Sequence, residues 1–199
     1  FLREMEFNRL LSSAISAYGE PSLESIKKDT KPKQNQKTIT KNDYHLITNI
    51  NEIDKWIKEA EEKGEVAFDT ETSSLDPHQA DLIGVSLSTQ IGKACYIPIG
   101  HNSKKSIDKD KVLKKLKPLL EDPSIKKIGQ NIKFDFIVMF KHGISISSME
   151  DTMLMSYVLD AGKNRHNMDT LSEIHLNHKT ITFKDLVGTG KKEISFAEV

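Results

Sequence analysis

Two acidic residues that follow an apolar run are the first candidates for chemistry. Asp69 and Glu71 come directly after residues 66–68, which read Val-Ala-Phe. Side chains alternate along a strand, so both carboxylates would lie on one face of it. Two carboxylates held close together repel each other unless a cation shares them, and a hard divalent ion with oxygen ligands is the usual cation. An exposed strand end with scattered acidic residues is the alternative, and this motif alone leaves both interpretations open.

A second group of polar residues lies where a strand leads into a helix. Residues 129–135 read Gly-Gln-Asn-Ile-Lys-Phe-Asp. Asn131 and Asp135 are four residues apart and would share one face of the helix, whereas Lys133 lies elsewhere on it and could reach a phosphate. The alternative is an ordinary helix start, with Asn131 as the N-cap and Asp135 in solvent.

Apolar periodicity and turn residues predict the elements that position these motifs. Strands are expected at 44–47, 65–70, 82–88, 94–99 and 125–129, and helices at 51–64, 110–120, 132–142, 151–159 and 168–176. Pro118 is expected to disturb the second of these helices. Three strands followed by helix, strand and further helices predict an α/β or α+β layered domain around a mixed sheet.

The first forty residues differ from this domain. Residues 1–18 carry apolar side chains at helical spacing, and residues 19–41 are Lys-rich and poor in apolar side chains, which predicts a flexible linker. The main domain is then expected to occupy residues 42–199. Because the chain starts at Phe1 and stops abruptly at Val199, we expect it to be a fragment of a longer protein.

The charges are balanced overall but unevenly distributed. The 199 residues carry 29 Lys and Arg against 29 Asp and Glu, a formal net charge of zero. This balance argues against a protein that holds nucleic acid by its overall positive charge. Residues 41–100 carry 5 Lys and 11 acidic residues, however, and residues 102–133 carry 10 Lys and 4 acidic residues. An acidic part that attracts metal and a Lys-rich part that could face nucleic acid therefore cancel each other.

Other classes of protein and of site are excluded. No apolar run approaches the ~20 residues that span a membrane, and the N-terminus lacks the apolar core of a signal peptide. The single Cys95 rules out a disulfide framework and fits a reducing compartment, so we expect a cytoplasmic monomer. Asp151 is interpreted as a helix N-cap. His175 and His178 lack a Cys partner for a zinc site, and residues 188–190 lack the spacing of a phosphate-binding loop.

The two polar motifs, taken together with the order of elements, resemble a known family. Asp-x-Glu on the first main strand, followed about sixty residues later by Asn-x3-Asp, resembles the proofreading 3′–5′ exonuclease domain of family A DNA polymerases of the bacterial DNA polymerase I type. Collinear similarity extends over residues 68–75, 94–101, 116–122, 129–135, 150–154 and 178–183. The resemblance implies a ribonuclease H-like fold and two-metal hydrolysis of 3′-terminal nucleotides with Mg²⁺ or Mn²⁺. It also makes residues 1–18 look like the tail of a preceding 5′-nuclease domain.

The same resemblance assigns roles to individual residues. Asp69, Glu71 and Asp135 match the family's catalytic, metal-binding carboxylates. The apolar residues that wedge against the terminal bases are matched by Leu75 and Phe183. Contacts to the substrate strand are matched by Gln130, Asn131, Lys133 and Phe134, and a contact to a phosphate is matched by Arg165. The implied partners are the single-stranded 3′ end of DNA and a polymerase domain of the same natural chain.

One departure from the family pattern bears on activity. The family's third motif, Tyr-x3-Asp, does not occur in the 199 residues. Its register would place it on the order of ten to fifteen residues past Val199, so the chain by itself is expected to bind metal poorly and to have little activity. Two alternatives stay open: a non-catalytic, exonuclease-like scaffold domain of the polymerase, and an RNase D-like RNA 3′-exonuclease, against which the segment at 1–41 argues.

Overall fold

The computed structural model describes residues 1–19, 44–102, 105–190 and 193–199. The chain divides into two units, with the boundary between Asn35 and Gln36. The described part of the first unit contains the helix α1 (Asn8–Tyr18), in which no residue is buried. The helix expected over residues 1–18 therefore begins at residue 8. The linker expected over residues 19–41 lies, apart from its first residue, outside the described residues.

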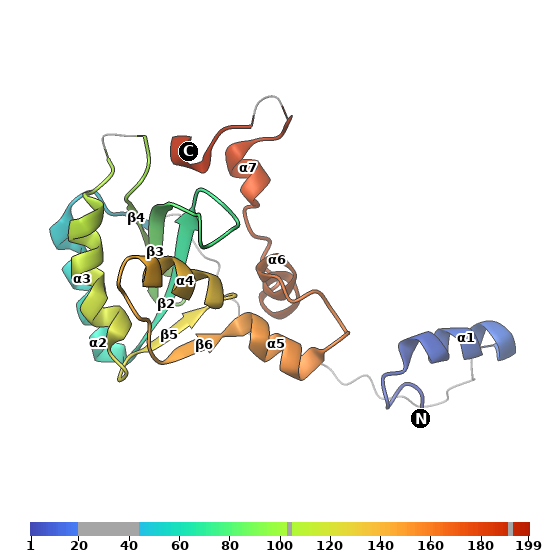
Figure 1. Ribbon diagram of the computed structural model, residues 1–199. Helices are drawn as coiled ribbons and strands as arrows, with labels where there is room; N and C mark the ends of the chain where they lie inside the picture. Colours follow the sequence, from blue (N-terminus) through green and yellow to red (C-terminus); the bar gives the residue numbers. More distant parts are fainter. Residues whose placement is uncertain (20–43, 103–104, 191–192) are drawn as a thin grey trace. The chain divides into compact units, whose positions relative to one another are not determined.

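Six strands of the second unit form one mixed sheet in the order β1-β4-β3-β2-β5-β6 (Figure 1). The strands are β1 (Tyr44–Leu46), β2 (Glu65–Thr72), β3 (Leu82–Gln90), β4 (Lys93–Pro98), β5 (Lys126–Gly129) and β6 (Met149–Asp151). The β2–β3 and β3–β4 pairs are antiparallel, and the β1–β4, β2–β5 and β5–β6 pairs are parallel. The predicted mixed sheet is thus confirmed. The strand β6 was not predicted, because three residues are too few to show alternation.

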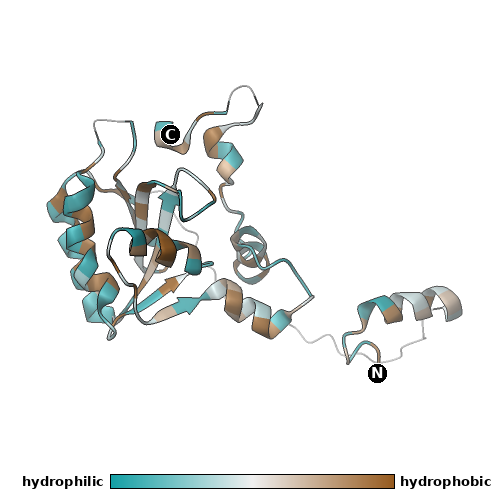
Figure 2. Ribbon diagram, viewed as in Figure 1, coloured by the Kyte–Doolittle hydropathy of each residue, from teal (hydrophilic) through white to brown (hydrophobic). Residues whose placement is uncertain are grey.

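One face of this sheet carries the hydrophobic core. It is covered by α2 (Ile53–Lys63), which follows the short 3-10 helix η2 (Ile50–Glu52), and by α3 (Lys109–Glu121). Val138 and Met139 of α4 (Lys133–Lys141) belong to the same core. Hydrophilic and hydrophobic residues alternate along the ribbon of α3 (Figure 2), as expected for a helix with one buried face.

Pro118 does not interrupt α3, contrary to the expectation. The helix continues to Glu121, and the Asp122 N–H donates to the Pro118 carbonyl (3.1 Å). A proline near the end of a helix removes one backbone hydrogen bond. Burial of Leu116, Leu119 and Leu120 on the same helix outweighs that loss.

The segment after β6 consists of short helices with mostly exposed residues. These are α5 (Thr152–Asp160), α6 (Met168–Leu171), the π-helical turn η3 (Ser172–Leu176), α7 (Phe183–Val187) and the 3-10 turn η5 (Phe196–Glu198). Val187 is their only fully buried apolar residue among those described. In the described residues, none of the helices combines the length and the apolar character needed to cross a bilayer.

Candidate active site

The strand β2 presents two carboxylates on the sheet face opposite the core. Val66, Phe68 and Thr70 are buried toward the core, whereas Asp69 and Glu71 alternate with them and are half-buried. The prediction that both acidic side chains share one face agrees with this alternation. Small residues on the neighbouring strand β3 lie opposite them: Asp69 pairs with Ser86, and Glu71 pairs with Gly84.

Asp135 reaches the same strand from α4. It lies in the first helical turn and is only 2% exposed. Its Oδ1 accepts two hydrogen bonds from Thr70, one from the backbone N–H (2.8 Å) and one from the hydroxyl (2.6 Å). Thr70 stands between Asp69 and Glu71 in the strand. The two hydrogen bonds therefore bring the third predicted carboxylate next to the other two, and the alternative of a solvent-exposed Asp135 is wrong.

The three carboxyl groups are destabilised as anions. Burial, and then the charges of Asp135 and Glu71, raise the pKa of Asp69 to about 7. Burial and the charge of Asp135 also raise the pKa of Glu71. Burial raises the pKa of Asp135 to about 6, although the hydrogen bonds from Thr70 act in the opposite direction. Carboxylates in such surroundings favour a nearby cation, because a cation relieves their mutual repulsion.

The chemistry of these donors fits a hard divalent cation. Among the described residues, no three His, Cys, Asp or Glu side chains form a group already arranged to hold a metal ion. Mg²⁺, however, is commonly held by one or two carboxylates together with waters and substrate phosphates rather than by a cage of protein ligands. Carboxylate oxygens also suit Mg²⁺ or Mn²⁺. Asp69, Glu71 and Asp135 are therefore the residues that would hold such an ion.

Leu75, a predicted base contact, stands on a well-held loop. Its side chain is 97% exposed. The base of the loop is closed by hydrogen bonds from the Ser73 N–H to the Asp81 carbonyl (3.0 Å) and from the Asp81 N–H to the Ser73 hydroxyl (2.9 Å). From α4, the Lys141 ammonium donates to the Ala80 carbonyl (2.7 Å). An exposed leucine on a braced loop is suited to contact a ligand.

Gln130 uses both ends of its amide within the protein. Its Nε2 donates to the His166 carbonyl (2.7 Å), and its Oε1 accepts from the Thr152 hydroxyl (2.6 Å). Arg165, another predicted strand contact, is exposed and precedes His166 in the chain. Gln130 therefore holds in place the segment that carries Arg165, a role that sequence reasoning did not anticipate.

The backbone of Asn131 joins the loop before α4 to the start of α5. It has a left-handed φ of 57°, and its N–H donates to the Asp151 Oδ1 (3.0 Å). The same oxygen accepts from the N–H groups of Met153 (2.9 Å) and Leu154 (3.4 Å), so Asp151 is the N-cap of α5, as predicted. The N-cap of α4 is Ile132, which makes the alternative of Asn131 as N-cap wrong.

The remaining predicted contacts lie at the starts of α4 and α7. Lys133 is exposed at the first position of α4, and Phe134 beside it is half-buried and packs against the core. Phe183 begins α7, is 56% exposed and stacks on Phe196, with ring centroids 5.8 Å apart.

Much of the Lys-rich stretch, as far as the structure describes it, packs away from the carboxylates. Most of it is α3, which packs on the opposite face of the sheet. Within it, Lys115 pairs with Asp54 (2.6 Å) and Lys117 with Glu121 (2.6 Å). Lys127 is fully buried. Lys133, at the end of the same stretch, is exposed two residues before Asp135, so the expectation that the basic stretch could face nucleic acid stays a prediction.

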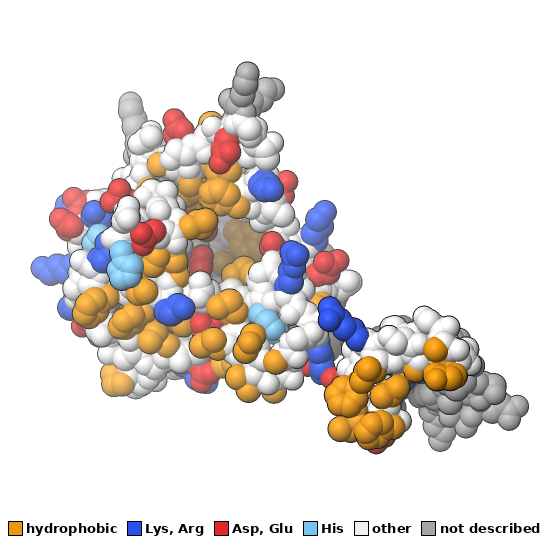
Figure 3. All heavy atoms as spheres, turned by 45° about the vertical axis from the view of Figure 1, so that its right-hand side comes forward, with side chains coloured by type: hydrophobic (Ala, Val, Ile, Leu, Met, Phe, Trp, Pro, Cys, Tyr) orange, Lys and Arg blue, Asp and Glu red, His pale blue; other side chains and the backbone are white. Residues whose placement is uncertain are grey.

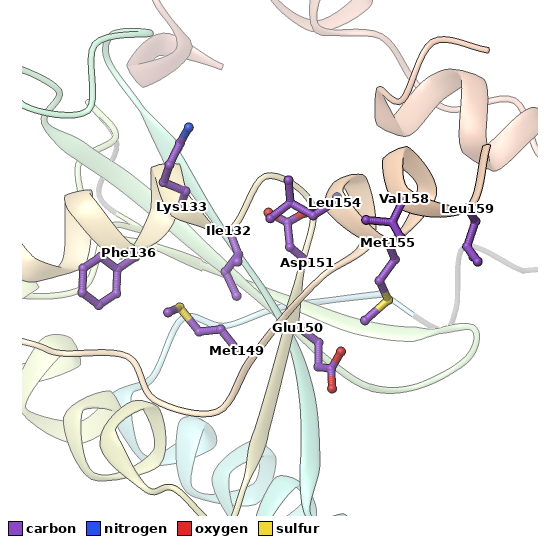
Figure 4. A pocket seen from close by; sticks show the side chains of 10 residues that line it. All are labelled: Ile132, Lys133, Phe136, Met149, Glu150, Asp151, Leu154, Met155, Val158 and Leu159. Carbon is purple, nitrogen blue, oxygen red and sulfur yellow. Dashed lines mark hydrogen bonds between the residues drawn. The ribbon is translucent and has the colours of Figure 1, made fainter. Parts of the chain in front are cut away.

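Two hollows lie near the predicted site residues. A cavity of about 230 Å³ on the open sheet face is lined by residues that include Ala67, Asp69, Ser86, Ser88, Gln130 and Thr152. Figure 3 shows a hollow on the side turned forward, with acidic side chains in and beside it. A groove of about 730 Å³ between α4, β6 and α5 has a largely apolar lining, including Phe136, Met149, Leu154 and Val158 (Figure 4). Because Asp69, one of the three coupled carboxylates, and Gln130 line the first hollow, we place the candidate site at this hollow and the adjoining end of β2.

Thr70 is a site residue that sequence reasoning missed. Strand alternation shows that it faces the core, but its partner Asp135 lies 65 residues away along the chain. A hydroxyl between two acidic residues on a strand is the only local signal for it.

The comparisons with known proteins identify the family. A family model described as 3′–5′ exonuclease matches residues 44–199. The chain belongs to this family. It is 42% identical over 163 residues to DNA polymerase I of Pseudomonas aeruginosa, a match that covers 79% of this chain and 18% of the relative. The chain thus spans less than a fifth of the length of that relative.

Solved nuclease structures share the fold. Brucella melitensis NrnC with bound Mg²⁺ is 25% identical, with a TM-score of 0.50 over 74% of this chain and 67% of that one. RNase D of Escherichia coli, described as an exoribonuclease, is 18% identical, with a TM-score of 0.56 over 73% of this chain and 36% of that one. The ribonuclease H-like 3′–5′ exonuclease fold expected from the resemblance is thereby confirmed.

Proposed function

We propose that residues 42–199 remove nucleotides from the single-stranded 3′ end of DNA, as the proofreading domain of a DNA polymerase I in the cytoplasm. The observation that carries this proposal is the set of three coupled carboxylates: two on the open face of β2 and one held against the same strand by Thr70. Membership in the 3′–5′ exonuclease family and 42% identity to a DNA polymerase I support the reaction and the substrate.

In this proposal, residues at different positions have different roles. Asp69, Glu71 and Asp135 would hold Mg²⁺ or Mn²⁺, as the presence of Mg²⁺ in the similar NrnC supports. When bound, a pair of such ions supplies charge stabilisation to the attacking and leaving oxygens of an in-line phosphoryl displacement. Thr70 fixes the Asp135 carboxylate by two hydrogen bonds. The exposed side chains of Leu75 and Phe183 would contact the terminal bases, and the exposed Arg165 would contact a phosphate.

Contacts of this kind do not depend on base sequence. Stacking and apolar contacts act on the faces of all four bases, and phosphate contacts act on the backbone. Trimming without sequence preference is what a proofreading function requires. A polymerase domain of the same natural chain would supply the strand end.

The test is trimming of a 3′-labelled single-stranded DNA by the full natural protein with Mg²⁺. We expect Asp135→Asn to lower the single-turnover rate by at least 100-fold, because the variant loses a charged ligand while keeping a similar shape. Mn²⁺ titration of the same variant should show weakened binding. Asp110→Asn makes the same chemical change on the exposed surface of α3 and is the matched control.

Three outcomes are informative. Undiminished trimming by Asp135→Asn would contradict the site. Absence of trimming in the unchanged natural protein would favour the non-catalytic scaffold. A strong preference for RNA over DNA of the same sequence would favour the RNase D-like alternative, although the three retained carboxylates and the higher identity to DNA polymerase I support the DNA reaction.

A further inference from the structure

Tyr96 shares the open sheet face with the carboxylates. Across three neighbouring strands, Asp69 pairs with Ser86 and Ser86 pairs with Tyr96, so these side chains point to the same face. One pair further along, Glu71 lies opposite Gly84. A Cβ atom added to Gly84 would lie 1.9 Å from the Tyr96 hydroxyl oxygen. The Tyr96 hydroxyl therefore lies directly over Gly84, beside the position of Glu71.

His101 fixes the direction of this hydroxyl. The Tyr96 Oη and the His101 Nε2 are 2.6 Å apart, and the His101 Nδ1 is buried without a hydrogen-bond partner in the described residues. A buried N–H without an acceptor is rarer and costs more than a buried lone pair. The imidazole proton is therefore on Nε2, which donates to Tyr96 Oη. The proton of Tyr96 is left to donate to another group.

The protein itself does not provide that acceptor. In the part of the chain that the structure describes, Tyr96 Oη has no hydrogen-bond partner besides His101. Burial and the charge of Glu71 raise the pKa of Tyr96 above its usual range, so the hydroxyl stays protonated at neutral pH. A protonated, oriented donor beside a carboxylate that would hold metal is positioned for an anionic oxygen of a ligand.

A series of aromatic rings connects this hydroxyl to a predicted substrate contact. The His101 ring lies 5.6 Å from the Tyr96 ring and 5.7 Å from the Phe196 ring, measured between centroids. Phe196 in turn stacks on Phe183 at 5.8 Å. Tyr96 and Phe183 are thus held by one set of contacts.

We propose that Tyr96 is a further substrate-contacting residue, whose hydroxyl, oriented by His101, donates a hydrogen bond to a non-bridging oxygen of the scissile phosphate. Gly84 is required for this arrangement, because any side chain at position 84 would occupy the place of the Tyr96 hydroxyl. The inference rests on the proposed function, since it requires a phosphate bound beside Glu71.

The first test replaces Tyr96 by Phe in the full natural protein. Tyr96→Phe loses the hydrogen bond to a charged oxygen and should therefore lower the single-turnover trimming rate by about 10- to 100-fold. The Mn²⁺ affinity should remain that of the unchanged protein, because all three carboxylates are retained. The protein should still fold, with a melting temperature lowered by a few degrees, because the ring is retained while the His101 Nε2 proton loses its acceptor. Tyr157→Phe is the matched control, because the ring of Tyr157 also packs edge-on against a histidine, His166, at 5.1 Å.

The second test concerns orientation. Gln at position 101 can place an N–H donor near the former Nε2, whereas Leu cannot, so His101→Gln should trim faster than His101→Leu. Gly84→Ala should displace the Tyr96 ring and reproduce the loss caused by Tyr96→Phe. The double variant Gly84→Ala/Tyr96→Phe should then be no slower than the slower single variant.

The outcomes separate this inference from the proposed function. If Asp135→Asn is inactive but Tyr96→Phe trims as fast as the unchanged protein, the Tyr96 contact is wrong and the nuclease assignment stands. Equal rates for the Gln and Leu variants at position 101 would also overturn it. If the unchanged natural protein does not trim at all, both proposals fail.

Discussion

At the scale of single residues, the carboxyl group of Asp69 is the one that the folded protein changes most. Its pKa rises to about 7 because burial and two neighbouring acidic groups disfavour its charge. In the unfolded chain the same group titrates near 3.9. Between these pH values the folded protein holds a proton that the unfolded chain has lost. The stability that this group contributes is therefore fully present below about pH 4 and lost as the pH rises through 7.

This difference predicts how an uncharged residue at position 69 behaves. In metal-free protein with EDTA, Asp69→Asn should raise the melting temperature by several degrees at pH 8 and by much less at pH 5. Thermal unfolding followed by circular dichroism measures both. A variant that is equally stabilised at both pH values would show that the gain does not come from the charge. Saturating Mg²⁺ should reverse the order at pH 8, because only the unchanged protein keeps the full set of ligands.

At the scale of elements, Asp151 joins the loop before α4 to the start of α5. Its Oδ1 caps α5 through Met153 and Leu154 and also accepts from the left-handed Asn131 N–H. We expect Asp151→Ala to lower the free energy of unfolding by about 1 to 2 kcal/mol, the usual cost of a lost N-cap. Urea denaturation measures this change. Asp151→Ser, which keeps a capping oxygen, should recover most of the stability, and equal losses for Ala and Ser would contradict the capping role.

The same elements show how far sequence reasoning reaches. The strands around Asp69 and the helix that carries Asp135 follow from apolar periodicity, because each buries a regular set of side chains. The helix α7 was missed although Thr182 and Asp185 form a capping box at its start, because five residues show no clear period. The segment expected as one helix over 168–176 changes at Ser172 into a π-helical turn. Propensity does not distinguish these two backbone forms.

The sequence predicts the carboxylates of the candidate site better than it predicts the residues that hold them in place. Asp69 and Glu71 are recognisable because their alternate positions on one strand place two negative charges on the same face, which is unfavourable without a cation. Thr70 and Gln130 contact residues that are 65 and 36 positions away. Such contacts depend on how helices and loops are placed on the sheet, which local patterns do not determine.

At the scale of the whole molecule, the core residues that the structure describes all belong to the second unit. Its buried side chains begin at Ile47, and α1 buries none of its residues. Removal of residues 1–41 should therefore leave the melting temperature of the second unit within about 2 °C of its value in the whole chain. Calorimetry of the two chains tests this. A larger loss would show that the nuclease domain does not begin near residue 42.

The hydrogen bonds between Thr70 and Asp135 also have a thermodynamic consequence. They fasten the carboxylate of Asp135, on α4, to the central strand β2, so the proposed metal ligands come together only when the sheet and α4 are folded together. Ion binding and folding are then linked equilibria: each tenfold rise of free ion above its dissociation constant adds about 1.4 kcal/mol to the stability of the unit. The Mg²⁺ concentration would thus act on the abundance of the folded protein as well as on the rate of the proposed trimming.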